Sequence, residues 1–71
     1  MEKRSLSIAG HRTSIALEPE FWAALDAMAK EAGQPLAALI RSIDGSRATT
    51  NLSSAVRLAV LAWYQGKVRQ N

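Results

Sequence analysis

Cysteine is absent from this sequence, and histidine occurs only once, at His11. Without cysteine the chain forms neither disulfide bonds nor thiolate metal sites, and a lone histidine lacks the clustered ligands that a metal ion needs. No glycine-rich loop of the kind that cradles phosphates in nucleotide-binding enzymes is present either. These absences predict a protein with no cofactor and no metal, which is not an enzyme.

Long hydrophobic runs are also missing. The most apolar stretch, residues 55–64, contains Arg57 and is much shorter than the roughly 20 apolar residues that a membrane-spanning helix needs. The basic first residues are not followed by the apolar segment of a secretory signal. We therefore expect no membrane partner, and the lack of cysteine agrees with a location in the reducing cytoplasm.

The chain is short but strongly apolar. It has 71 residues, of which 48% are hydrophobic, so it forms at most one domain and is too apolar for a disordered tail. A domain of this size buries only about 60% of the surface that its unfolded chain exposes, so a lone copy is marginally stable. Sharing the core with a second copy offsets this deficit, and we expect a homodimer or a higher oligomer.

Positive charge gathers near the N-terminus. The net charge is +3, and the pI is about 10.0. The first twelve residues hold a single carboxylate, Glu2, against Lys3, Arg4, His11 and Arg12. A phosphate backbone is attracted by the local electrostatic potential more than by the total charge of the chain. We assign residues 1–10 to a basic N-terminal arm.

Alternating side chains predict a β-strand at residues 11–17. Leu6 and Ile8 alternate more weakly with serines before Gly10. The apolar residues stand at even positions before Gly10 and at odd positions after it. This change indicates a bulge, a turn or a break there. The stronger alternation is typical of a strand with one buried face, with Thr13, Ile15 and Leu17 on one side and Arg12, Ser14 and Ala16 on the other.

Two amphipathic helices follow the strand. Proline suits a helix start and glycine a helix end, so Pro19 and Gly33 delimit the first helix, and Pro35 and Gly45 the second. Polar residues 44–51 (DGSRATTN) predict a loop. Apolar residues recur at helical spacing in both helices: Phe21, Trp22, Leu25, Met28, Ala29 and Ala32 in the first, and Leu36, Leu39, Ile40 and Ile43 in the second.

A third helix is predicted at residues 52–65, with Asn51 or Thr50 as its cap. Its apolar residues cover nearly the whole circumference, which is typical of a helix that is buried on more than one side. This helix is either an extra cover for a dimer core or a surface for a further partner. The main domain then spans residues 11–66, and residues 67–71 form a flexible tail.

The order of the elements indicates how two copies pair. One strand cannot satisfy its own backbone hydrogen bonds. Pairing it with the same strand of a second copy gives an antiparallel ribbon with two-fold symmetry. A two-stranded ribbon fits the major groove of DNA, which is about 12 Å wide.

Four motifs resemble the ribbon-helix-helix family of repressors and antitoxins. They are GHRTSI, LEPEFW, AGQPLAALIR and NLSSAVR, and the similarity extends from about Lys3 to Tyr64. Within this family the chain is similar to a subgroup of small bacterial proteins. The resemblance implies a mainly α fold with one β-strand, in an intertwined homodimer with a two-stranded antiparallel intersubunit ribbon and an additional C-terminal helix.

The family's second helix can be aligned with this chain in two ways. In the first, the family's second helix starts at Pro35, which we favour because Gly33, Leu39, Ile40 and Arg41 match the family spacing. In the second, residues 51–64 are the family's second helix, and residues 35–44 are an insertion.

The resemblance also implies roles for residues on the ribbon. In the family, ribbon side chains contact base edges, and by position these are Arg12, Ser14 and Ala16. Arginine makes a bidentate contact to guanine and serine contacts several bases, whereas alanine only touches a thymine methyl group. Many family members have a polar residue where this chain has Ala16, which leaves fewer base-reading residues here.

The family further holds a backbone phosphate with the amides at the start of its second helix. Pro35 has no N–H, so this clamp is weakened or rebuilt from neighbouring amides. The residues expected to contact the DNA backbone are Lys3, Arg4, His11, Gln34 and Leu36. Those expected in the dimer core are Ile15, Leu17, Trp22, Leu25, Leu39, Ile40, Ile43, Val56 and Val60.

Two functions are consistent with these features. The first is a transcriptional regulator that binds double-stranded DNA with full or partial sequence specificity. The second is a protein–protein interaction module that has kept the fold but has little or no DNA binding, and therefore has a protein partner. The basic strand, the order of the elements and the family resemblance favour the first, which leads. Ala16, Pro35 and the modest charge favour the second, which is the alternative.

Overall fold

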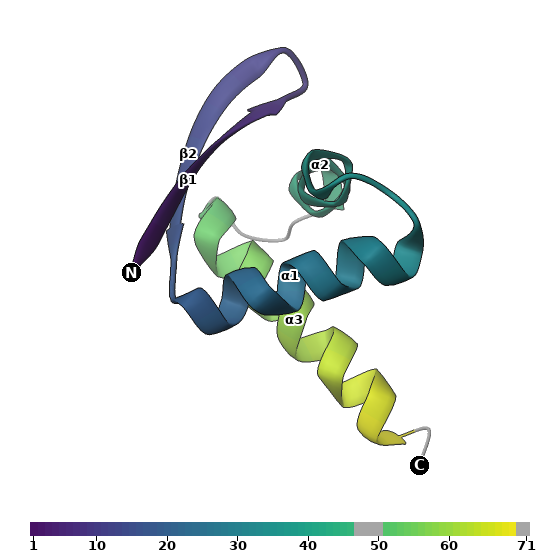
Figure 1. Ribbon diagram of the computed structural model, residues 1–71. Helices are drawn as coiled ribbons and strands as arrows, with labels where there is room; N and C mark the ends of the chain where they lie inside the picture. The colour runs from purple at the N-terminus through teal and green to yellow at the C-terminus, as the bar shows by residue number, and fades with distance from the viewer. Residues whose placement is uncertain (47–50, 70–71) are drawn as a thin grey trace.

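A twisted β-hairpin and three helices make up the fold (Figure 1). The computed structural model describes residues 1–46 and 51–69. β1 packs against α2, β2 packs against α3, and α1 contacts both of these helices. All three helices lie to one side of the hairpin, whose other face carries no element from the described residues. The elements are β1 (Glu2–Ile8), β2 (His11–Leu17), α1 (Pro19–Ala32), α2 (Leu36–Ser46) and α3 (Leu52–Arg69).

The hairpin corrects the prediction of a single strand. β1 and β2 pair antiparallel, from Glu2 opposite Leu17 to Ile8 opposite His11. The predicted basic arm, residues 1–10, is therefore mostly strand, because the weak alternation of its side chains is reinforced by pairing with β2. Since β2 already has a partner in its own chain, a missing strand partner no longer argues for a second copy.

A two-residue turn at Ala9 and Gly10 joins the strands. Of the three alternatives predicted near Gly10, a bulge, a turn or a break, the structure has the turn. Both residues have positive φ, 52° for Ala9 and 83° for Gly10. Two-residue turns with positive φ at both positions match the twist of the flanking strands and favour Asn-Gly. This conformation raises the free energy of a residue such as alanine by about 1 kcal/mol or more, and asparagine tolerates it better.

We therefore expect Ala9→Asn to stabilise the protein by about 0.5–1 kcal/mol, because it relieves strain in the turn without changing a packed contact. Urea unfolding followed by circular dichroism measures this change. Gly10→Ala is the matched control and should destabilise the protein, since a Cβ there meets no neighbour and only the backbone conformation is strained. An unchanged or lower midpoint for Ala9→Asn would contradict the assignment of strain to this turn.

Local sequence explains the helix ends. α1 starts at Pro19, and the carbonyl of Glu18 accepts from the N–H of Phe21 at 2.9 Å. It ends at Gly33, whose φ of 69° is left-handed. α3 starts after Asn51, whose side-chain oxygen accepts from the N–H of Ser54 at 3.2 Å. Asn51 is thus the cap, and the alternative, Thr50, lies outside the described residues.

The second and third helices are longer than predicted. α2 continues through Gly45 to Ser46, so part of the predicted loop is helical, and residues 47–50 lie outside the described residues. α3 continues to Arg69, beyond the end predicted at residue 65, and so includes the first three residues of the tail predicted at 67–71. An ion pair between Lys67 Nζ and a carboxylate oxygen of Glu31, 2.9 Å apart, joins this last part of α3 to α1.

The core lies between the hairpin and the three helices. All nine residues predicted for a dimer core belong to it, and only Leu39 and Ile43 are partly exposed. A single chain therefore buries these side chains, and a second copy is not needed to cover them. The largest fully buried side chains are Trp22, Ile15, Leu17, Leu25, Ile40 and Val56.

Candidate nucleic-acid interface

The uncovered face of the hairpin is the candidate interface. Side chains of directly paired residues share a face, and alternate residues of a strand point to opposite faces. Because the turn has two residues, odd positions of β1 pair with even positions of β2. The face that points away from the helices therefore carries Lys3, Ser5, Ser7, Arg12, Ser14 and Ala16, which we call the outer ribbon face.

This face is polar and positively charged. All its side chains are exposed except that of Ala16, which is half-buried. Ser5 and Ser14 lie opposite each other, with their hydroxyl oxygens 3.1 Å apart. Lys3 lies near the open end of the hairpin and Arg12 near the turn, and the outer ribbon face contains no carboxylate. Among the described residues neither cation forms an ion pair, so both remain available to an anionic partner.

Two residues of this face were missed from the sequence. Arg12, Ser14 and Ala16 were predicted to point outward together, and the structure places them so. Ser5 and Ser7 join them because residues 1–10 form a strand and not an arm. Their signal in the sequence was the alternation with Leu6 and Ile8, which is too short to specify a strand without its partner.

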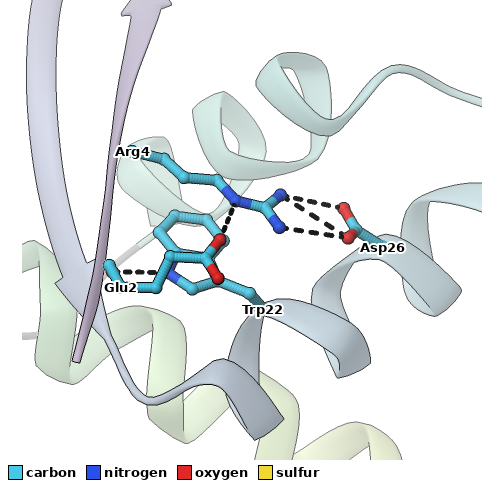
Figure 2. A network of polar contacts seen from close by, with 4 residues as sticks. All are labelled: Glu2, Arg4, Trp22 and Asp26. Carbon is cyan, nitrogen blue, oxygen red and sulfur yellow. Dashed lines mark hydrogen bonds and ion pairs between the residues drawn. The ribbon is translucent and has the colours of Figure 1, made fainter.

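Arg4 lies on the opposite face, among the helices (Figure 2). Its Nε donates to a carboxylate oxygen of Glu2 at 2.7 Å, and its Nη1 donates to Asp26 at 3.3 Å. The guanidinium carbon sits 4.6 Å from the centre of the Trp22 ring, whose Nε1 donates to the carbonyl of Glu2 at 2.8 Å. These contacts engage Arg4 within the chain, on the face opposite the outer ribbon face, and its role as a DNA-backbone contact stays a prediction.

The charges around Arg4 favour its protonated form. The hydrogen bond to Glu2 is the main cause that raises the pKa of Arg4 above its ordinary value, and Asp26 acts in the same direction. Arg4 therefore joins the hairpin to α1 as a permanent cation stacked on an indole ring. The same network explains why Glu2, the only carboxylate near the N-terminus, does not reduce the charge of the outer ribbon face.

The turn of the hairpin lies beside α2. A hollow between them is lined by Ser7 and Ala9 from the hairpin and by Pro35, Ala37 and Arg41 from the α2 region, among others. Arg41 is exposed and adds a cation next to the end of the outer ribbon face. It was not predicted as a contact residue, because helix periodicity does not tell which residue of α2 approaches the turn. His11 is exposed beside the turn, on the face opposite Arg12.

The predicted phosphate clamp at the start of α2 is only partly available. The backbone N–H of Gln34 donates to the carbonyl of Ala29 at 3.0 Å, because it completes the left-handed cap of α1. The first bond within the new helix runs from Leu39 to Pro35. The amides of Leu36, Ala37 and Ala38 precede that bond and have no acceptor in α2 itself. A phosphate held here would therefore contact these amides rather than that of Gln34.

A second polar link fastens α3 to the start of α1. Arg57 Nη2 donates to a carboxylate oxygen of Glu18 at 3.0 Å. The pKa of this carboxyl lies below its ordinary value. The main cause is a hydrogen bond from Glu18's own backbone N–H, and the second is the hydrogen bond from Arg57. This pair lies away from the outer ribbon face, and it engages Arg57, one of the cations of α3, in an ion pair within the chain.

The described residues form neither a metal-binding cluster nor a membrane-spanning helix. In the described part of the chain, no three histidine or acidic residues gather closely enough to hold a metal ion. Among the helices at residues 19–46 and 52–69, none has the length and apolarity needed to cross a membrane. The outer ribbon face and the adjoining start of α2 therefore remain the strongest polar candidate.

The comparison with known families gives one match. The model of the family described as "Ribbon-helix-helix domain" matches residues 1–64, which include both strands, α1, α2 and most of α3. No curated protein and no solved structure matches the chain significantly.

Proposed function

Because the chain belongs to the ribbon-helix-helix family, we propose that it binds double-stranded DNA through the outer ribbon face and acts as a transcriptional regulator. Domains of this family are generally DNA-binding regulators and typically have no enzymatic activity. The observation that carries the proposal is a two-stranded ribbon with one uncovered, polar face whose cations Lys3 and Arg12 have no partner among the described residues. A DNA partner implies a location in the bacterial cytoplasm.

The width of the ribbon supports insertion of a single hairpin. Neighbouring strands lie about 4.8 Å apart, so a two-stranded ribbon fits a major groove about 12 Å wide. The intersubunit ribbon expected from the sequence would add a second copy at the free edge of β2. The resulting four strands span about 14 Å between the outer strands, which is wider than the groove. We therefore assign groove binding to the hairpin of one chain.

Each residue of the outer ribbon face has a distinct chemical role in this proposal. Arg12 is suited to a bidentate contact with guanine, and the hydroxyls of Ser5, Ser7 and Ser14 can donate to or accept from base edges. Ala16 contacts at most a thymine methyl group. Lys3, as a flexible point charge, is suited to a phosphate and carries no sequence information.

The flank of the groove is assigned to the start of α2. The amides of Leu36 and Ala37, with Arg41 beside them, present donors and positive charge next to the hairpin turn. Gln34 stays in the proposal through its side chain, and His11 through its exposed position beside the turn. These groups would fix the position of the ribbon on the duplex.

A salt titration tests DNA binding directly. We expect the affinity for a labelled duplex, measured by fluorescence anisotropy, to fall linearly on a plot of log K against log salt concentration. The slope of this plot should be about −3 per bound chain, because three cations contribute to binding: Lys3, Arg12 and Arg41. Selection from a pool of random duplexes then identifies a preferred site. Failure to bind any duplex at low salt would overturn the proposal and favour the protein–protein interaction module.

A further inference from the structure

The hydroxyls of Ser5 and Ser14 form a pair in the middle of the outer ribbon face. The two residues lie directly opposite each other and are the central pair of the hairpin register. Their hydroxyl oxygens are 3.1 Å apart, so one hydroxyl donates a hydrogen bond to the other, and both side chains are exposed. A partner that lies along the ribbon therefore meets the two hydroxyls together, one from each strand.

The bond between the hydroxyls limits what the pair can offer to a partner. Two hydroxyls carry two protons, and their mutual bond uses one of them. Either oxygen can be the donor in this bond. The donating oxygen keeps its lone pairs, and the accepting hydroxyl keeps its own proton, which can point outward. The pair therefore presents one donor and one acceptor side by side, and not two donors.

The four bases differ in how well they match such a pair. In the major groove, adenine presents an acceptor, N7, beside a donor, the N6 amino group. Guanine presents two acceptors, N7 and O6, which require two donors. Cytosine and thymine each present a single hydrogen-bonding group there. Both groups of the serine pair thus match adenine, whereas guanine is matched fully only if the bond between the hydroxyls is broken.

We propose that Ser5 and Ser14 act as one unit that recognises adenine, so that the chain prefers duplexes with an adenine under the centre of the ribbon. This inference rests on the proposed function and names the class of DNA that the outer ribbon face binds. One serine oxygen accepts from the N6 amino group, and the free hydroxyl proton is donated to N7. Since each strand supplies one hydroxyl, neither strand has this preference by itself.

Arg12 sets the position of this adenine relative to a guanine. Arg12 and Ser14 are two positions apart on β2 and share its outer face, so they are about 6.8 Å apart along the strand. Stacked bases are about 3.4 Å apart, which places the adenine about two base-pair steps from the guanine that suits Arg12. On the other side of the serine pair lie Lys3 and Ala16, neither of which makes a bidentate base contact. The preferred site should therefore be specified mainly at the guanine and the adenine.

Selection from random duplexes, followed by anisotropy titrations, tests the serine pair. Exchange of the adenine for guanine should lower the wild-type affinity about 5- to 150-fold, the range for a bidentate contact. Ser5→Ala and Ser14→Ala should each remove most of this discrimination, and at the same base pair, because a single hydroxyl aligns less well with both groups. Ser7→Ala is the matched comparison, since it removes a hydroxyl from the same face, opposite Arg12, and should change both affinities by the same factor. Circular dichroism shows that each variant is folded.

Two double variants test whether the hydroxyls act together. Ser5→Ala with Ser14→Ala should lose little more discrimination than either single variant, because each already breaks the unit. Ser5→Ala with Ser14→Asn should regain the adenine preference, since asparagine supplies a donor and an acceptor from one side chain. If the wild type binds DNA without preferring adenine, or if the two serines affect different base pairs, this inference is wrong and the proposed function stands. If no duplex binds at low salt, the proposed function fails and this inference fails with it.

Discussion

Trp22→Ala should lower the free energy of unfolding by about 3–5 kcal/mol. The indole is 1% exposed in the centre of the core, so truncation leaves a cavity among the hairpin and α1 side chains. It also removes the donor to the Glu2 carbonyl and the ring on which Arg4 is stacked. A domain of this length has a total stability of about 4–11 kcal/mol, so the loss amounts to between about a quarter and all of it.

Two further variants separate the causes of this loss. Trp22→Phe keeps an aromatic ring in the core but loses the N–H, and should cost only about 1–2 kcal/mol. Trp63→Ala removes the same kind of side chain from a half-buried position on α3 and should cost clearly less than Trp22→Ala. Urea unfolding, followed by circular dichroism at one fixed protein concentration, compares the three variants. Equal losses for Trp22→Ala and Trp63→Ala would contradict the central role of Trp22.

The helices follow from local chemistry in the sequence, and the hairpin does not. Pro19, Gly33 and Asn51 act within a few residues of themselves, so the ends that they set are visible in the sequence. β1 depends on a partner across the turn, and its own alternation is confined to Leu6 and Ile8. A strand that is stable only when paired has little signal of its own.

The outward face was predicted for β2 but not for β1, although Lys3 and Arg4 were predicted to contact DNA. The reason is the alternation of faces along a strand, which depends on whether a position number is odd or even. The alternation around Ile15 and Leu17 fixes the outward face of β2. For β1, the face depends on the length of the turn, because a two-residue turn places Lys3 outside and Arg4 inside, whereas one residue more would reverse them. The sequence shows a cluster of positive charge but cannot divide it between a ribbon face and an internal network.

The core predicted from the sequence contains residues that the structure buries within one chain. Buried side chains such as Ile40 and Val56 have the same periodic pattern whether the cover comes from the same chain or from a second copy. The hairpin completes the cover of the core, because residues 2–8 fold back to pair beside β2 and pack against α2. The outward side of α3 also remains exposed among the described residues, and periodicity alone did not separate it from the inward side.

Arg12→Ala should weaken binding to the preferred DNA site by about 5- to 150-fold, which corresponds to the loss of about 1–3 kcal/mol for a bidentate contact to guanine. Arg12 is exposed on the outer ribbon face and has no ion-pair partner among the described residues, so the folded chain loses no internal contact. The stability of the variant should therefore stay within about 0.5 kcal/mol of the wild type. Anisotropy titrations with the selected duplex and with a random duplex measure both specific and non-specific affinity.

Substitutions that change charge and geometry separately decide what Arg12 does. Arg12→Lys keeps the charge but loses the planar fork, so it should retain the salt slope and the affinity for random DNA while losing preference for the selected site. Arg4→Gln removes the same charge from the other face of the same hairpin, where Arg4 is held by Glu2 and Asp26. It should cost about 1 kcal/mol of stability and leave the salt slope unchanged. If Arg4→Gln weakens DNA binding as much as Arg12→Ala does, DNA responds to the total charge of the chain, and the outer ribbon face does not enter the groove.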